Sequence, residues 1–172
     1  HDLYLYSTSA WADPFVYDWT AISAYGASTM DYVLVDCNHA ATGDYFLEVR
    51  NWSGSASYTV EHAAHIADIT TGTYGPYSMA VGELIEIFDA NFAAGTSKNI
   101  AVHATSGDAN LGLLLHQSNS ADPATQMQAR PSAVATALGA GVGEVECLTY
   151  TATTSDWSYL TAMARSAEGS SM

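Results

Sequence analysis

Histidines are the first residues of this chain to consider for chemistry. His62 and His65 are separated by two alanines, so on a helix their rings would share one face and could bind a metal ion. The pair lies between a strand-like run and a segment rich in glycine and threonine, and no general base stands between the rings. We therefore interpret these histidines as exposed or hydrogen-bonded. His1 offers an amine and a ring to copper, but it aligns with Ala109, an ordinary residue in the repeat described below.

No enzyme motif accompanies these histidines. The sequence has neither a Gly-x-Ser-x-Gly nucleophile turn nor a phosphate-binding glycine loop. We therefore predict a protein without catalytic activity of its own.

Two cysteines and one asparagine are candidates for covalent modification. Cys37 and Cys147 occupy matching places in the two halves of the chain and could form disulfides, either within the chain or between chains; buried free thiols are the alternative. Asn51-Trp52-Ser53 is an N-glycosylation sequon in a predicted turn, so we mark Asn51 as a glycosylation candidate.

The charge balance excludes several classes of partner. The chain has 4 Lys and Arg against 18 Asp and Glu, a formal net charge of -14. Such a surface repels nucleic-acid phosphates and anionic membranes. No apolar run is long enough to span a membrane. Scarce lysine with abundant Ser, Thr, Gly and Tyr favours an extracellular or cell-surface protein, compatible with glycans, cations or basic partners.

Short aromatic or alternating runs separated by polar turns predict an all-β, antiparallel sandwich fold. Pro131 to Leu138 fits a short helix or a crossover loop equally well. The predicted strands are Leu3–Ser7, Phe15–Trp19, Tyr32–Cys37, Tyr45–Val49, Ser57–Glu61, Glu83–Phe88, Lys98–Thr105, Leu111–His116, Val145–Thr151 and Trp157–Ala164.

An internal repeat organises these runs. Four short matches recur at separations of 108 to 112 residues, so the chain contains one domain-sized passage twice. We predict two tandem sandwich modules, at residues 1–66 and 79–172, joined by a linker at 67–78. The matched passages are Asp2–Leu5 with Asn110–Leu113, Ala12–Pro14 with Ala121–Pro123, Val35–Cys37 with Val145–Cys147, and Asp44–Tyr45 with Asp156–Trp157.

Several strand and turn motifs resemble the bacterial pre-peptidase C-terminal type of β-sandwich. The resemblance implies a noncatalytic, secreted module with a binding, stabilising or secretion-related role. Related sandwiches hold calcium near an acidic strand start, which would place Asp108 and its first-repeat counterpart Asp2 near the ion, although Asn110 replaces the second acidic residue. The residues that carry the resemblance are Asp2–Leu5, Ala41–Val49, Ala56–Val60, Phe92–Thr96 and Ser106–Leu113.

The two copies are unequal at their ends. Residues Met79–Gly107 precede the strand at Asn110, whereas His1 alone precedes Asp2; the second copy in turn has no counterpart of Ser57–Glu61. The chain could be a fragment of a longer protein, be completed by neighbouring copies, or begin with a smaller module.

We predict a structural or assembly module, such as a surface-filament subunit that polymerises head to tail by strand complementation. The alternative is a noncatalytic glycan- or calcium-binding accessory domain, since aromatic residues such as Tyr4, Trp11 and Trp19 could stack on sugars.

Overall fold

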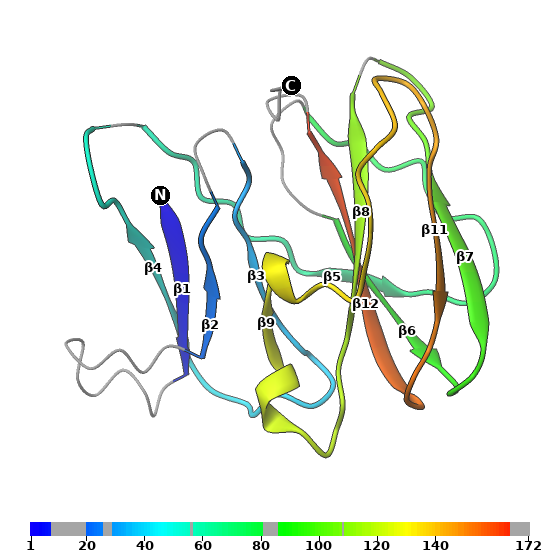
Figure 1. Ribbon diagram of the computed structural model, residues 1–172, viewed down its shortest axis with the longest axis horizontal. Helices are drawn as coiled ribbons and strands as arrows, with labels where there is room; N and C mark the ends of the chain where they lie inside the picture. Colours follow the sequence, from blue (N-terminus) through cyan, green and yellow to red (C-terminus); the bar gives the residue numbers. More distant parts are fainter. Residues whose placement is uncertain (8–19, 26–28, 56, 81–85, 108, 166–172) are drawn as a thin grey trace. The chain divides into compact units, whose positions relative to one another are not determined.

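The computed structural model is all-β, as the sequence predicts (Figure 1). It describes residues 1–7, 20–25, 29–55, 57–80, 86–107 and 109–165. Within these ranges the strands pair antiparallel, except that β5 (His65–Asp68) runs parallel to β6 (Glu86–Phe92). For Pro131 to Leu138 the sequence fitted either a short helix or a loop. The structure has a 3-10 turn at Arg130–Ser132 there, followed by a strand at Ala135–Ala137.

The chain folds into two compact units, and both are discontinuous in sequence. The first comprises residues 1–59 and 118–132, and the second comprises 60–117 and 133–172. The predicted boundaries differ because they used sequence order alone. Residues 118–132, predicted in the second module, pair with the first, and part of the predicted linker 67–78 lies in β5, which pairs with β6.

The first unit has two small sheets around one core. A three-stranded sheet has the order β2-β1-β4, and a separate pair joins β3 to β9. The core centres on Leu5, Ala21 and Ala129, with Val33, Val35, Tyr45 and Met127 packed against it. The strands are β1 (Asp2–Ser7), β2 (Ala21–Ser23), β3 (Val33–Val35), β4 (Tyr45–Arg50) and β9 (Met127–Ala129), with a 3-10 turn at Pro123–Thr125.

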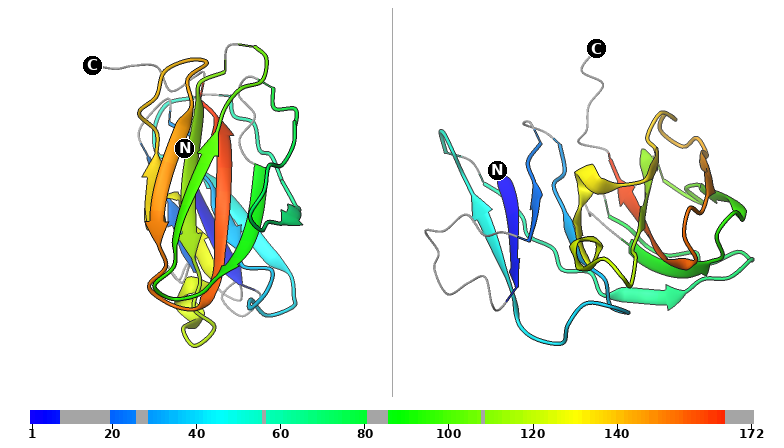
Figure 2. Two further views of the ribbon diagram at one scale, coloured as in Figure 1. Left: turned by 90° about the vertical axis from the view of Figure 1, so that its right-hand side faces the viewer. Right: turned by 60° about the horizontal axis from the view of Figure 1, so that its bottom comes forward.

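The second unit is the larger sandwich. Its five-stranded sheet has the order β10-β8-β12-β6-β5, and β11 pairs with β7 in a second sheet. Figure 2 shows these sheets, with β12 in red and β11 in orange. Between them lies a core that includes Phe88, Leu113, Leu148 and Leu160. The remaining strands are β7 (Ser97–Val102), β8 (Leu111–Gln117), β10 (Ala135–Ala137), β11 (Glu146–Thr151) and β12 (Asp156–Ala164).

The two units share a four-strand order. The sheet β2-β1-β4 corresponds to β10-β8-β12, and β3 corresponds to β11 in the opposing sheet. Leu5 pairs with Ala21 and Leu115 pairs with Ala135, and the residue before each alanine donates to the leucine C=O. Leu5 and Leu115 are 110 residues apart, so the structural counterpart of Leu5 lies two residues beyond its sequence match Leu113, on the same face of the strand.

Later sequence matches are one residue out of phase with the structure. Val35 packs against the first core, whereas its matched residue Val145 is exposed and precedes β11. Tyr45 packs against the first core. Its matched residue Trp157 lies on the face of β12 opposite Leu160, and it is Leu160 that packs in the second core. A shift of one residue moves a side chain to the other face of a strand, so these matches do not mark equivalent positions.

Some predicted strands are wrong and others lie outside the described ranges. Residues 57–61 form no strand, although their alternation suggested one. Phe15–Trp19 and the first residues of Glu83–Phe88 are not described, and β6 continues to Phe92. The strands β2, β5, β9 and β10 were not predicted, because runs of three or four residues carry little periodicity.

Two core-facing leucines test how complete each core is. Leu113 is 1% exposed, whereas Leu47 on β4 is 43% exposed. We expect Leu113→Ala to lower the free energy of unfolding by about 2–5 kcal/mol. Leu47→Ala should lower it by less than about 1 kcal/mol, because little apolar area leaves water there. Urea unfolding of both variants checks this, and equal losses would contradict it.

Candidate strand-pairing site

The free edges of the strands are the candidate site, and backbone geometry identifies them. Side chains alternate between the two faces of a strand, and each residue's N–H and C=O point to one edge. In a chain of L-residues, the face of the side chain fixes that edge for a given strand direction. A core-facing side chain therefore tells which edge its backbone groups serve.

The outer edge of β4 has no paired strand among the described residues. Leu5 C=O accepts a hydrogen bond from Thr20 N–H at 2.8 Å, so the backbone groups of Tyr4 point the other way, to its partner Glu48 on β4. The alternate residues of β4, including Leu47, then direct their N–H and C=O away from β1. In the second unit β6 occupies the corresponding edge of β12, where Leu160 pairs with Phe88.

This edge also exposes the first core. Leu47 lies on the same face of β4 as Tyr45, which packs against that core. It is nevertheless 43% exposed. In the second unit β12 presents Leu160 and Ala162 to the core, and both are buried. The described part of the first unit thus lacks the cover that β6 and β7 give to the second.

β9 does not replace β7, because it pairs with the opposite edge. Asp36 N–H donates to Gln126 C=O at 2.8 Å, so Leu34 and Asp36 direct their backbone groups to β9. Val33 and Val35, which pack against the Leu5 core, direct theirs to the other edge of β3. In β11 the core-facing residues serve β7, as shown by the 3.0 Å bond from Ala152 N–H to Thr96 C=O. When β3 and β11 are each viewed from the core of their own unit with the chain running in the same direction, β9 lies on one side of β3 and β7 lies on the opposite side of β11.

Polar contacts anchor the start of the segment that carries β9. His39 Nδ1 lies 2.8 Å from Asp36 Oδ2 and 3.3 Å from Ser118 Oγ, and Asp36 is fully buried. This is the residue set of a hydrolytic triad, but both contacts use the same ring nitrogen. A triad needs the serine at the nitrogen opposite the carboxylate, so we interpret the group as a structural clamp. Sequence reasoning missed it because Ser118 is 79 residues from His39.

Arg130 anchors the far end of the same segment. Its guanidinium donates to Met30 C=O and lies 4.8 Å from the centre of the Tyr25 ring. The side chain is 6% exposed. A buried arginine that donates to a backbone carbonyl and stacks on an aromatic ring fixes the position of its segment, because guanidinium is planar and always charged.

A charged network joins β1 to β4 on the face of the sheet opposite Leu5, where Tyr4 and Tyr6 are buried. Arg50 contacts both carboxylate oxygens of Glu48, at 2.7 and 2.9 Å, and its guanidinium lies 4.5 Å from the centre of the Tyr4 ring. Tyr6 Oη donates to Glu48 at 2.7 Å. Hydrogen bonds from Arg50 lower the pKa of Glu48. Burial, followed by the contact with Glu48, raises the pKa of Tyr6 to about 12.

The predicted calcium residues do not form a cation cage in the described structure. Asp2 Oδ2 accepts a 2.6 Å hydrogen bond from Trp52 Nε1. Asn110 lies in the second unit, with its side-chain oxygen buried and unpaired, and Asp108 lies outside the described residues. Calcium binding at these positions stays a prediction. Trp52 is 63% exposed, and the Arg50 guanidinium lies 5.1 Å from the centre of its ring, so Arg50 already covers part of the indole surface.

The candidate modification residues are accessible. Cys37 belongs to the first unit and Cys147 to the second, and both are exposed, free thiols. The expectation of burial as the alternative to a disulfide is therefore wrong for both. Asn51 is exposed, and its amide donates to Gly54 C=O at 2.9 Å, where Gly54 has a φ of 73°. Interchain disulfides and glycosylation stay predictions.

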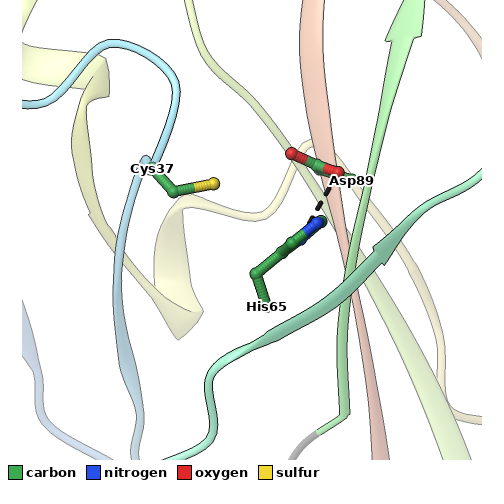
Figure 3. A group of neighbouring side chains, drawn as sticks. All are labelled: Cys37, His65 and Asp89. Atoms are coloured by element: carbon green, nitrogen blue, oxygen red, sulfur yellow. Dashed lines mark ion pairs between the residues drawn. The ribbon is translucent and has the colours of Figure 1, made fainter.

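The His65 ring lies close to two carboxylates in the second unit. It lies 3.1 Å from Asp68 Oδ1 and 3.4 Å from Asp89 Oδ1, the latter drawn in Figure 3 together with Cys37 of the first unit. Asp68 lies on β5 itself, so it is the contact with Asp89 that joins β5 to β6. His62 precedes β5 in an irregular segment, so the helical spacing that would have paired it with His65 does not exist.

Comparisons with known proteins assign no family. No protein-family model matches the sequence, and no curated protein or solved structure matches it. The resemblance to pre-peptidase C-terminal modules therefore stays a prediction. Among the described residues, no helix is long and apolar enough to cross a membrane.

Tyrosine titration tests the network between β1 and β4. The folded pKa of Tyr6 is raised from 10.0 to about 12, so its contribution to stability is present below pH 10 and lost as the pH rises toward 12. The ultraviolet difference between wild type and Tyr6→Phe should show one tyrosine ionising near pH 12. Tyr74→Phe is the control, because hydrogen bonds with Thr70 lower the pKa of Tyr74. Ionisation of Tyr6 near pH 10 would contradict the network.

Proposed function

We propose that this chain is a structural module of an extracellular or cell-surface assembly, in which the first unit is completed by a strand from another copy. The observation that carries the proposal is the outer edge of β4. Its backbone groups have no paired strand in the described structure, while β6 fills the corresponding edge of β12. A β6-type strand is therefore the natural occupant.

The composition of the β4 edge supports pairing. Proteins usually protect an exposed edge with lysine, proline or a bulge. The three residues that direct their backbone outward are Tyr45, Leu47 and Val49, and none is charged or proline. The charged residues Glu48 and Arg50 bind each other on the far face. An added strand would pair its backbone and cover Leu47 in one step.

Strand addition of this kind favours a growing assembly. The acceptor edge lies on the first unit, whereas the strand types that fit it belong to the second. Such an interface is heterologous, so copies add head to tail and form a filament unless the rotation closes a ring. A net charge of -14 opposes the approach of copies, so assembly should strengthen as salt screens the repulsion.

The Leu47 amide provides a direct test. Because its N–H points to the open edge, Leu47→Pro blocks pairing without removing a hydrogen bond to β1. Leu47→Ala is the matched control, since it shortens the side chain and keeps the amide. Sedimentation and electron microscopy across a concentration series should show polymers of wild type, and Leu47→Pro should weaken assembly by at least about tenfold relative to Leu47→Ala.

A synthetic peptide of residues 86–102, which contains β6 and β7, supplies a second measurement. The peptide should slow hydrogen exchange at the Leu47 and Val49 amides and block polymer growth. A chain that stays monomeric at all concentrations and ignores the peptide would refute the proposal. Equal assembly of Leu47→Pro and Leu47→Ala would show that β4 is not the acceptor.

A further inference from the structure

The indole of Trp52 lies at the surface of the first unit, just after β4. Trp52 is 63% exposed and belongs to a turn in which the Asn51 side-chain amide donates to Gly54 C=O at 2.9 Å. A single exposed apolar side chain is common on protein surfaces and needs no special explanation. What distinguishes Trp52 is that its neighbours fix the orientation of its ring.

Two contacts hold the Trp52 ring in place. Its Nε1–H donates to Asp2 Oδ2 at 2.6 Å, which fixes one edge of the ring. The Arg50 guanidinium lies over the ring, 5.1 Å from its centre, and covers one of the two faces. No aromatic ring of the described residues stacks on the opposite face. A ring that is oriented before binding loses little conformational freedom when a ligand stacks on it.

Arg50 is itself fixed, so it gives the indole a firm support. Its guanidinium binds both carboxylate oxygens of Glu48, at 2.7 and 2.9 Å, and lies 4.5 Å from the centre of the buried Tyr4 ring. Asp2 pairs with Arg50 across β1 and β4, so both contacts with the indole come from one cross-strand pair. The register of these two strands therefore positions Trp52.

A flat aromatic face beside a hydrogen-bond acceptor suits a sugar ring. A β-glucopyranose carries its hydroxyl groups equatorially, so its faces consist of C–H groups that can stack on an indole, while the hydroxyls project at the rim. Asp2 Oδ1 makes no hydrogen bond to another described residue, so it can accept one from such a hydroxyl. Ligand sites commonly combine an aromatic surface with a few well-placed polar groups.

Charge decides between the classes of ligand that stack on an indole. A cation is disfavoured, because the Arg50 guanidinium already lies on the other face of the same ring. An anionic sugar is disfavoured by the net charge of -14 and by Asp2 at the edge of the ring. A neutral sugar meets neither repulsion. In a β-1,4-linked glucan the equatorial linkages produce a flat ribbon, which can lie on an open surface without a pocket.

We propose that the exposed face of Trp52 binds a neutral β-1,4-linked glucan, with Asp2 accepting a hydrogen bond from one of its hydroxyls. This goes beyond the proposed function, because it assigns a ligand to the module and uses side chains rather than the backbone edge of β4. One ring on an open surface binds weakly, with a Kd on the order of 1 mM for a hexasaccharide. Repetition of the site in an assembly would raise the avidity for a long glucan.

Titration with cellohexaose, followed by nuclear magnetic resonance of the tryptophan indole N–H groups, tests the site. The full chain has four tryptophans, and Trp52→Phe identifies the Trp52 signal. At a protein concentration below that of polymer formation, cellohexaose should shift this signal saturably and leave the other three unchanged. The matched control is a β-1,4-linked glucuronic acid hexamer, which has the same linkage but carries negative charge and should shift none of them.

Substitutions separate the stacking surface from its support. Trp52→Ala should weaken the affinity for cellohexaose by at least about tenfold. Tyr74→Ala, which removes a 40% exposed aromatic ring from the second unit, should leave the affinity unchanged. Asp2→Ala should weaken binding, whereas Asp2→Asn keeps an oxygen that can accept the indole N–H and should retain most of it. Calorimetric titration measures these affinities, and unchanged circular dichroism confirms that the variants fold.

Each contrary result overturns the proposal. These results are an unshifted Trp52 signal at about ten times the expected Kd, equal affinity of wild type and Trp52→Ala, and equal shifts with the neutral and the anionic hexamer. A shift produced by tetralysine instead of cellohexaose, and weakened by salt, would identify a cationic partner. Polymer formation and Leu47→Pro, which test the proposed function, are separate measurements, so the failure of either proposal is distinguishable from failure of the other.

Discussion

The fixed hand of a β-strand, which ties each face to one edge, is the constraint on which this structure depends. A side chain that enters the core commits its backbone N–H and C=O to a single neighbouring position. Those groups need a partner, because an unpaired buried amide is costly. In the second unit β6 and β7 meet the demand for Leu160 and Leu148. In the first unit the backbone N–H and C=O of the core-facing Leu47 point to the outer edge of β4, where the described residues provide no strand.

Core packing follows the same division. Leu113 is enclosed by two sheets, whereas Leu47, at the outer strand of the first unit, stays 43% exposed. The first unit offsets part of this by recruiting β9 from a connection of the second half. Buried polar groups hold that segment at both ends: Asp36 with His39 and Ser118 at its start, and Arg130 at its end. These contacts explain why a histidine, a serine and an aspartate meet without the geometry of a catalytic triad.

Sequence reasoning predicted the fold class and the longer strands, where alternation extends over six or more residues. It failed at Ser57–Glu61, where alternation exists but no neighbouring strand pairs with it. It also matched Val35 to Val145, although these residues face differently, because residue identity does not record which face of a strand is buried. None of the network around Glu48 was predicted, since its members are brought together by the register of β1 with β4.

The sequence by itself determined the β-rich class, the duplicated passage and the strongly acidic surface, since composition and local alternation specify these directly. Only the tertiary structure decided that β9 joins the first unit, that β7 and β9 occupy opposite edges, and that no described strand pairs with the outer edge of β4. The physical reason is that a two-residue period specifies the faces of a strand, whereas its edges are specified by hydrogen bonds to strands far away in the sequence.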